Sequence, residues 1–566
     1  MLKQNHVAEK HEVTEPISQC QTMKEDSVAH EKDPRAPQLR QGITRRDLVV
    51  KGGSVAALAL LAPSSVTAAP TLVTSTPWRV SAARQEPKTG GTLNVTQPIP
   101  IAPFEFQQLG PHMAFLAKNV FDTLIRYDAQ LQPQPRLAES WTWNAEATEL
   151  TLKLRQGVTY HSGRAFTSDD VKFSIERARD PAVASQWRGY SNTITEIVLP
   201  DAATVVLRFA TPNLAIFDML SMLVMLDSAT AAELEGAGQV IGTGPFRWAE
   251  YAPGDRVVLA RNEEYWEEGK PYLDGIDLQI VDDKQSMVLS VESGQRDVAW
   301  QVLPQDLSRL EGHPQARPEV SQTGAQFYYI GAVTTAEGVS DKRIRQAFNA
   351  AIDRQRITET LIFGLVEPTA LPWPPASPAY NEEIDATVSF DLERARTLFA
   401  EAGVGPGTTL TVEANAQDPL NAQIAQIVQA DLATIDITLD LQSVENTVFQ
   451  QRLNESQFQQ LFANTMGFSN LSPVSFFVTA FPVRITGNAA QFDAPNYIAL
   501  VEQMQTATDQ AALKQLYDEM DRLLLDESFN MPICQAPQGW ALQQRVQGFS
   551  YDALNYVHLE NVWIDG

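Results

Sequence analysis

The sequence predicts an α/β, or mixed α+β, protein that is built from more than one packed unit. Three observations lead to this prediction. The chain has 566 residues, well beyond the length at which a single hydrophobic core stops growing. Strand-like and helix-like segments are interspersed along its length. Hydrophobic residues make up 44% and charged residues 20% of the chain, which is ordinary for a globular protein and excludes a fibrous or mainly disordered one.

Two strands are predicted where apolar side chains alternate with polar ones, at residues 150–154 and 205–209. Three helices are predicted from their first residues. Ser168, Asp341 and Asp391 are each followed by apolar residues at helical spacing, as expected for N-caps. Gly403 suits the left-handed position that ends the third helix. These local signals place strands and helices in both halves of the chain.

The charge of the chain argues against nucleic acid as a partner. The formal net charge is −26, and residues 1–68 contribute about +1 of it, so the remainder is strongly acidic. Nucleic-acid binding requires a basic face that displaces counterions from phosphate. The acidic balance indicates a solvated surface that keeps the protein soluble.

The first 68 residues predict export by the twin-arginine route. Arg45-Arg46 lie in the segment 44–51, and a short apolar run at 54–62 and small residues at 66–68 follow. The apolar run is short for a transmembrane helix, which is the weaker alternative. We expect cleavage after Ala68, a linker at 69–87, and a periplasmic or cell-surface protein, tethered only if the signal stays uncleaved.

Reactive groups are sparse in this sequence. Cys20 and Cys534 are the two cysteines, so a cysteine-based metal site and an internal disulfide of the exported part are excluded. The histidines have no metal-binding spacing, and neither a nucleophile elbow nor a phosphate loop is present. Residues 242–245 indicate a tight turn. We therefore expect no enzyme, no metal and no cofactor, although a pair of acidic residues could be hidden among the 69 present.

Several sequence blocks, in order, resemble the family 5 solute-binding proteins, which serve peptide, nickel, opine and oligosaccharide ABC importers. The resemblance runs from about residue 90 to the end of the chain. The blocks are residues 121–128, 135–141, 154–171, 242–246, 262–274, 293–297, 343–354 and 395–403. Their residues have core and turn character, so they specify a fold and do not mark a ligand site.

The resemblance implies a two-lobed periplasmic-binding-protein-like fold of type II, with an extra domain on the first lobe. Carried onto this chain, the first lobe comprises 88–125, 238–326 and 530–566. The extra domain is 126–237, and the second lobe is 327–529. The family binds its ligand in the cleft between the lobes and delivers it to an ABC permease in the membrane. We expect a monomer with a small-molecule or peptide ligand.

The resemblance also suggests residues that contact the ligand. Gly110, Pro111 and His112 align with the ligand-facing loop of the first lobe. Trp300 and Gln301 follow the block at 293–297 at the edge of the cleft, although Trp300 is equally expected in the core. In the second lobe, Gly467, Phe468, Ser469 and Asn470 occupy the loop where peptide binders of the family carry an aspartate four residues before a proline.

That aspartate is replaced by Ser469 in this chain, which favours an uncharged or weakly charged ligand, because a buried ammonium without a carboxylate is costly. Trp373 lies in a Pro-rich stretch at 368–378, which is interpreted either as a rigid surface connection or as a loop that presents the indole to the cleft. Two other functions stay open at this point: an exported hydrolase that acts on an oligosaccharide or peptide, and a sensor subunit that presents its ligand to a receptor. The sequence leaves peptide, sugar, opine and metal complex open as ligands.

Overall fold

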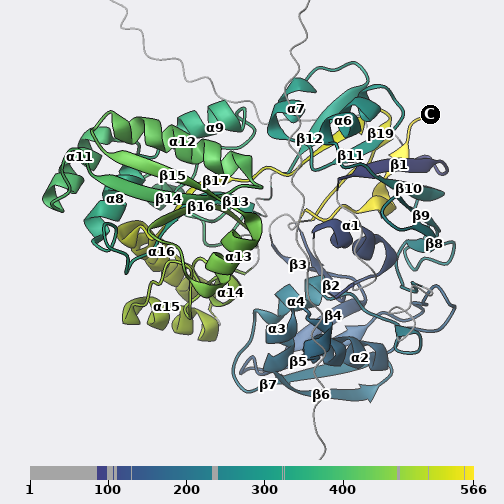
Figure 1. The fold of residues 1–566 in the computed structure, drawn as a ribbon. Coiled ribbons are helices and arrows are strands. Elements are labelled where there is room, and N and C mark those ends of the chain that lie inside the picture. The colour runs from purple at the N-terminus through teal and green to yellow at the C-terminus, as the bar shows by residue number, and fades with distance from the viewer. Residues whose placement is uncertain are drawn as a thin grey trace, which may run out of the picture. The chain divides into compact units, whose positions relative to one another are not determined.

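A computed structural model describes residues 86–98, 106–107, 111–128, 131–231, 240–321, 323, 326–467, 472–507, 509–552 and 555–566. Its helices and strands belong to one unit within Ala82–Gly566. Strands and helices are interspersed throughout (Figure 1), which confirms the predicted mixed class. Three larger sheets, with the helices that cover them, organise the described part of the chain.

The first of these is a seven-stranded sheet with β1 (Thr92–Gln97) near its centre. β1 runs parallel to β10 and β11. Apolar side chains on one face of the sheet pack against α1 (Pro111–Val120), and those on the other face pack against α6 (Lys284–Glu292) and α7 (Pro304–Arg309). In order, the strands are β12 (Ala316–Val320), β18 (Gly539–Gln543), β11 (Val298–Trp300), β1, β10 (Gly275–Ile280), β9 (Arg256–Arg261) and β8 (Phe246–Ala252).

A four-stranded antiparallel sheet is inserted between β1 and β8 in the chain. The helices of this insertion are α2 (Ser168–Arg179), α3 (Arg188–Thr193) and α4 (Ile216–Met222), with the short 3-10 helix η1 (Pro181–Val183) after α2. A two-stranded ribbon of β2 (Ile125–Tyr127) and β3 (Pro133–Pro135) precedes it. The order of the strands is β4 (Ala138–Trp143), β5 (Glu149–Leu154), β7 (Thr204–Phe209) and β6 (Ile194–Asp201).

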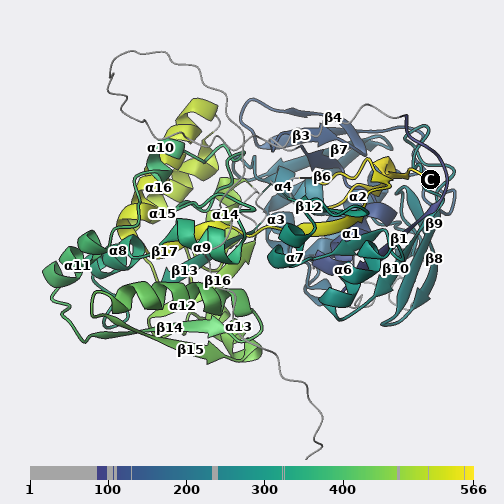
Figure 2. The same ribbon diagram turned by 90° about the horizontal axis from the view of Figure 1, so that it is seen from above.

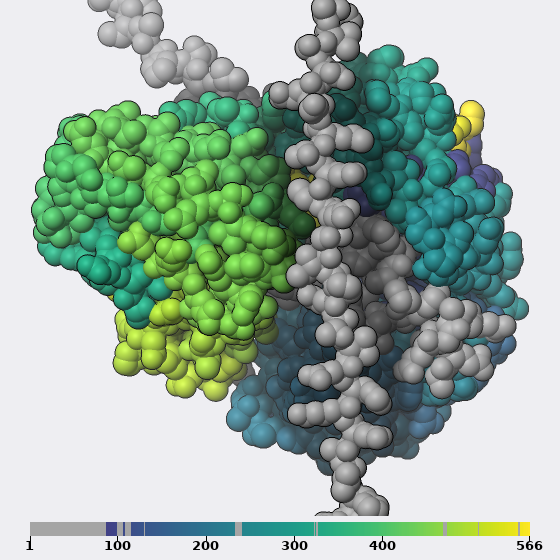
Figure 3. All heavy atoms as spheres, viewed as in Figure 1, coloured from purple at the N-terminus to yellow at the C-terminus, as the bar shows by residue number. Residues whose placement is uncertain are grey.

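A five-stranded sheet organises the second half of the chain. Its order is β15 (Thr438–Val444), β14 (Thr409–Asn415), β16 (Leu461–Gly467), β13 (Gln326–Ala332) and β17 (Asn530–Gln535). In the space-filling view of Figure 3, the atoms of this part of the chain, in green, form a continuous surface. The helices are α8 (Lys342–Ala350), α9 (Arg354–Leu361), α10 (Glu382–Asp385), α11 (Leu392–Glu401), α12 (Pro419–Ala433), α13 (Asn446–Glu455), α14 (Pro473–Thr479), α15 (Pro495–Thr506) and α16 (Gln510–Glu527).

β17 corrects one expected boundary. Residues 530–535 were expected with the first lobe, but β17 pairs antiparallel with β13 in the five-stranded sheet. The chain then returns to the seven-stranded sheet at β18. The last elements are β19 (Val546–Gln547), the 3-10 helix η2 (Leu559–Asn561) and β20 (Trp563–Ile564).

Two chain segments connect the seven-stranded sheet to the five-stranded sheet, one after β12 and one after β17. They run side by side and are joined by backbone hydrogen bonds. The Ser321 amide donates to the Gln538 carbonyl at 2.8 Å, and the Ala536 amide donates to the Gln326 carbonyl at 2.7 Å. A paired connection of this kind can bend through a few backbone dihedrals while both sheets keep their own hydrogen bonds.

The predicted local elements are largely confirmed. The apolar residues of 150–154 and 205–209 lie in β5 and β7, with their alternate side chains buried. Asp341 and Asp391 cap α8 and α11, accepting hydrogen bonds from the amides of Arg343 and Arg394 at 2.9 Å, and Gly403 has a φ of +79°. The predicted N-cap of α2, Ser168, is wrong by one residue. The N-cap is Thr167, and its amide donates to the Asp170 carboxylate at 3.0 Å.

A buried ion cluster joins the start of the inserted domain to the seven-stranded sheet. The Arg136 side chain, 8% exposed, pairs with Asp122 at 2.6 Å and with Glu267. Glu560 lies 3.9 Å from the same guanidinium and is 2% exposed. Arg136 also donates to the hydroxyl of Tyr265 at 2.8 Å. These groups come from distant parts of the chain. The single guanidinium of Arg136 therefore compensates the charges of carboxylates from several segments. Figure 2 shows the whole fold from a second direction.

Candidate functional site

Strand ends of the seven-stranded sheet position the first candidate residues. β1 and β11 are parallel, so their carboxyl ends meet at one edge, where α/β proteins commonly bind ligands. Trp300, the last residue of β11, is 5% exposed and packs edge-on against Phe115, with ring centroids 4.6 Å apart. Trp300 is therefore a core residue. Gln301 follows it with a φ of +56° and a half-buried side chain, which places this amide at the strand end.

The remaining loop candidates lie at or beyond the limits of the described residues. Gly467 ends β16 opposite Gln326 of β13, whereas Phe468, Ser469 and Asn470 lie outside the described residues, as does Gly110. Pro111 and His112 form the first turn of α1. The structure thus places the strands and helices on either side of these loops. Contacts of the loop residues with a ligand stay predictions.

The structure contradicts both interpretations of Trp373 given above. Its side chain is 1% exposed and packs against Phe476 and Phe477, at centroid distances of 5.2 and 5.6 Å. The indole nitrogen donates to the Asp521 carboxylate at 2.7 Å. Neither a surface connection nor a cleft-facing loop describes this residue. The Pro-rich stretch turns inward, and Trp373 belongs to the core around α14 and α16.

A buried carboxylate that the sequence analysis missed lies between α4 and α14. Asp218 of α4 is 0% exposed. It accepts hydrogen bonds from the hydroxyl of Tyr127 at 2.8 Å, from the amide of Ser472 at 3.3 Å and from the hydroxyl of Ser475. Burial raises its pKa to about 6, although these three donors favour the charged form. The only signal in the sequence is one carboxylate within the apolar run 215–220.

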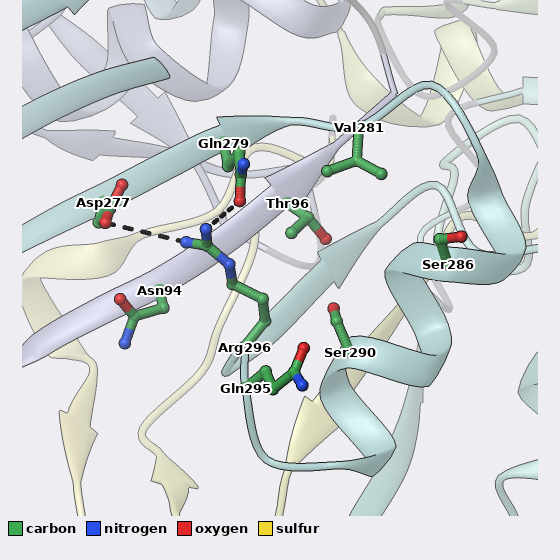
Figure 4. A pocket seen from close by; sticks show the side chains of 9 residues that line it. All are labelled: Asn94, Thr96, Asp277, Gln279, Val281, Ser286, Ser290, Gln295 and Arg296. Atoms are coloured by element: carbon green, nitrogen blue, oxygen red, sulfur yellow. Dashed lines mark hydrogen bonds and ion pairs between the residues drawn. The ribbon is translucent and has the colours of Figure 1, made fainter. Parts of the chain in front are cut away.

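A polar hollow of about 480 Å³ lies beside β1, β10 and α6. Figure 4 shows that Arg296 reaches across it towards Asp277 and Gln279. Thr96 and Asn94 contribute from β1, and Ser290 contributes from α6. The lining groups offer hydrogen bonds. Because the one cation in the lining already pairs with a carboxylate, the hollow holds no arrangement for acid–base or nucleophilic chemistry.

A second hollow, of about 270 Å³, lies beside α9 and α10. A carboxylate in its lining is used in hydrogen bonds within the protein. Asp385 in its lining accepts hydrogen bonds from the amides of Ala370 and Leu371, at 2.7 and 3.1 Å, and from the hydroxyl of Thr369 at 3.0 Å. These three hydrogen bonds fix the loop at residues 369–371, and the hydroxyl of Tyr380 donates a fourth to Asp385 at 3.2 Å. Its role is structural.

Burial shifts the pKa values of two histidines and of the cysteine in the described part of the chain. Burial lowers the pKa of His161 and of His558 to about 4, so both imidazoles are neutral at physiological pH. Burial raises the pKa of Cys534 to about 12, which makes this thiol a poor nucleophile. Within the ranges described, no three His, Cys, Asp or Glu side chains are grouped to hold a metal ion. None of the helices in these ranges is long and apolar enough to cross a membrane.

Comparison with known proteins identifies the family. The sequence profile described as "Bacterial extracellular solute-binding proteins, family 5 Middle" matches residues 132–487, which is more than half of the chain. The chain belongs to this family. As a family 5 protein it is a solute-binding protein, and the resemblance found in the sequence blocks is confirmed.

Relatives of known role agree with this assignment. Heme-binding protein A of Haemophilus influenzae is 25% identical over 487 residues, covering 80% of this chain and 88% of the relative. Di/tripeptide-binding protein 2 of Pseudomonas aeruginosa is 26% identical over 464 residues, covering 76% of this chain and 86% of the relative. These relatives bind different ligands, so the family assignment alone does not specify the solute.

Solved structures confirm the fold. The ABC transporter-associated periplasmic binding protein DppA from Helicobacter pylori, in complex with the peptide STSA, matches with a TM-score of 0.71 at 20% identity, covering 85% of this chain and 99% of DppA. The fold is thus the two-lobed one expected from the resemblance. Below, the seven-stranded sheet with its helices is called the first lobe, the inserted four-stranded sheet with β2, β3 and α2–α4 the extra domain, and the five-stranded sheet with its helices the second lobe. The alternative of an exported hydrolase finds no support among these relatives.

Proposed function

We propose that this family 5 protein captures a peptide or another small organic solute in the cleft between its lobes and delivers it to an ABC permease. The observation that carries the proposal is the family match over residues 132–487. The paired connection between the two large sheets supports a hinge. Ligand contacts that form fully only when the lobes close shift the balance between open and closed states by their own free energy. Such a cycle leaves the bonds of the solute intact.

Isothermal titration of the purified protein against peptides, sugars and metal complexes tests the proposal. We expect saturable binding of one solute per chain, and we expect mass spectrometry to recover that solute unchanged. Light scattering on the same sample is expected to give the mass of a monomer. Turnover of the bound solute would instead establish an enzyme.

The ligand loop of the second lobe supports a neutral or weakly charged solute. α14 begins at Pro473, so Ser469 lies four residues before that proline, where peptide binders of the family carry an aspartate. Serine cannot compensate a buried ammonium group. We assign ligand contact to Gly110, Pro111, His112 and Gln301 in the first lobe, and to Gly467, Phe468, Ser469 and Asn470 in the second.

Ser469→Asp is expected to strengthen binding of a free-amine tripeptide by roughly tenfold or more, because a desolvated charge pair forms. Ser469→Asn is the matched control, since it has the shape of aspartate without its charge. Titration calorimetry with the free and the N-acetylated form of one tripeptide separates the two effects. If the wild type already binds the free amine tightly and prefers it to the acetylated form, the argument from Ser469 fails.

We further propose export by the twin-arginine route, with cleavage after Ala68. These residues lie outside the described ranges, so the support comes from the sequence pattern at 44–68 alone. Replacing Arg45 and Arg46 together by lysine is expected to retain the protein in the cytoplasm at full length. Fractionation and N-terminal sequencing measure this outcome. Unchanged export of the double variant would exclude this route.

A further inference from the structure

The buried carboxylate of Asp218 connects two parts of the protein that hinge motion would separate. On one side, the carboxylate belongs to α4 of the extra domain and accepts the hydroxyl hydrogen bond of Tyr127, from the end of β2, at 2.8 Å. On the other side, its two donors belong to α14 of the second lobe and the residue that caps it: the amide of Ser472, at 3.3 Å, and the hydroxyl of Ser475. Closure of the lobes therefore forms hydrogen bonds to a buried carboxyl group.

The surroundings of Asp218 are neutral. Tyr190 of α3 and Tyr517 of α16 face the carboxylate, and the negative charge of Asp218 raises the pKa of each phenol in addition to the larger effect of burial. Lys118 donates to the carbonyl of Ser221, in the last turn of α4. Among the described residues, the salt bridges found include none to Asp218. Ser472 and Ser475, at the start of α14, are thus the donors that the second lobe supplies to this carboxyl group.

We propose that Asp218 is a latch that holds the second lobe against the extra domain and thereby sets the affinity of the protein for its solute. The inference rests on the hinge closure of the proposed function. Each hydrogen bond to Asp218 that is lost on opening favours the closed state. This advantage is largest at low pH, because burial disfavours the charged carboxylate. Ser472 lies two residues after Asn470 of the ligand loop in the sequence, so the latch and the ligand loop share one short segment of the second lobe.

The latch also predicts how closure depends on pH. Burial in the closed arrangement raises the pKa of Asp218 to about 6, whereas water in an open arrangement returns it towards its ordinary value near 4. The closed state therefore binds the proton more tightly than the open state. Its advantage is complete below the open-state pKa and decreases as the pH rises through about 6. The facing groups Tyr127, Tyr190 and Tyr517 stay neutral over this interval, because burial raises their pKa values.

Distances between spin labels on the full chain test the latch. Labels at cysteines replacing Glu176 of α2 and Gln503 of α15, both exposed, report on the separation of the extra domain and the second lobe. Cys20→Ser removes the remaining reactive thiol, since Cys534 is fully buried. Without solute at pH 5, Asp218→Ala and Ser475→Ala are expected to shift the open-to-closed ratio by roughly three- to tenfold towards longer distances, as for the loss of a hydrogen bond.

Asp521→Asn is the matched control. Asp521 is also 0% exposed and has a pKa raised by burial, to about 7, but its partner Trp373 lies in the same lobe. We expect this variant to leave the distances unchanged. The wild type should open progressively from pH 5 to pH 8, and Asp218→Asn should lose that dependence on pH.

The comparison between variants decides the latch. Equal distance distributions in the wild type and in folded Ser475→Ala would overturn it, and Ser475→Ala keeps the test valid if Asp218→Ala misfolds. In the same samples, shortening of the distances on addition of solute supports solute capture whether or not the latch exists. Failure of the latch and failure of the proposed function are therefore distinguishable.

Discussion

Arg136→Met is expected to lower the free energy of unfolding by about 3–5 kcal/mol, the typical effect of breaking a buried ion pair by removing one partner. The substitution keeps much of the side-chain volume but removes the charge. It leaves Asp122 and Glu560, both at most 2% exposed, and Glu267 without their shared cation. Each carboxylate must then be protonated or hydrated for the protein to fold. Urea denaturation at pH 7 measures the change.

Arg126→Met provides the matched control for this cluster. Arg126 reaches Glu560 at 3.6 Å, but its side chain is 36% exposed, so we expect a loss below about 1 kcal/mol. Equal losses in the two variants would show that burial of Arg136 does not determine its contribution. An Arg136→Met protein as stable as the wild type would contradict the assignment of this cluster as the joint between the extra domain and the first lobe.

Trp373→Ala is the second change with a large expected effect, a loss of about 3–5 kcal/mol in the free energy of unfolding. The indole is 1% exposed and contacts Phe476 and Phe477, so its removal leaves a cavity in the second lobe. Asp521 also loses its indole donor. Because Trp373 is a core residue, the solute affinity of the folded variant should stay within about twofold of the wild type, a difference below ~0.4 kcal/mol. Urea denaturation and titration calorimetry measure the two quantities.

The dependence on pH sharpens the Trp373 experiment. Burial raises the folded-state pKa of Asp521 to about 7. Its contribution to stability is therefore complete below its unfolded pKa near 4 and is lost as the pH rises through about 7. The indole hydrogen bond favours the ionised carboxylate, so the cost of Trp373→Ala should increase from pH 5 to pH 8. In an Asp521→Asn background the cost should not change with pH. A large loss of solute affinity at unchanged stability would instead indicate that Trp373 contacts the solute in the cleft.

Local features of the sequence predicted local structure well. Alternating leucines specified β5, and the capping aspartates Asp341 and Asp391 specified the starts of α8 and α11, because these patterns depend on neighbours a few residues away. The family resemblance added the two-lobed fold. In contrast, β17 was assigned to the wrong lobe, since its partner β13 lies about 200 residues earlier in the chain and pairing at that distance leaves no local trace.

The buried polar groups were harder to predict for the same reason. The proline-rich surroundings of Trp373 indicated a loop but not the direction in which the loop turns. That direction is set by Phe476, Phe477 and Asp521, which follow about 100 to 150 residues later. Asp218 looked like one carboxylate among 69. What distinguishes Asp218 is its burial and its hydrogen-bond donors Tyr127 and Ser475. These donors lie about 90 residues before it and more than 250 residues after it.

The central claim, solute capture by closure of the two lobes, is tested most directly by titrating the doubly labelled protein with the solute identified by calorimetry. The account predicts that the distance between the labels at positions 176 and 503 shortens in proportion to occupancy and stops changing at one equivalent. Saturable binding with an unchanged distance would contradict it.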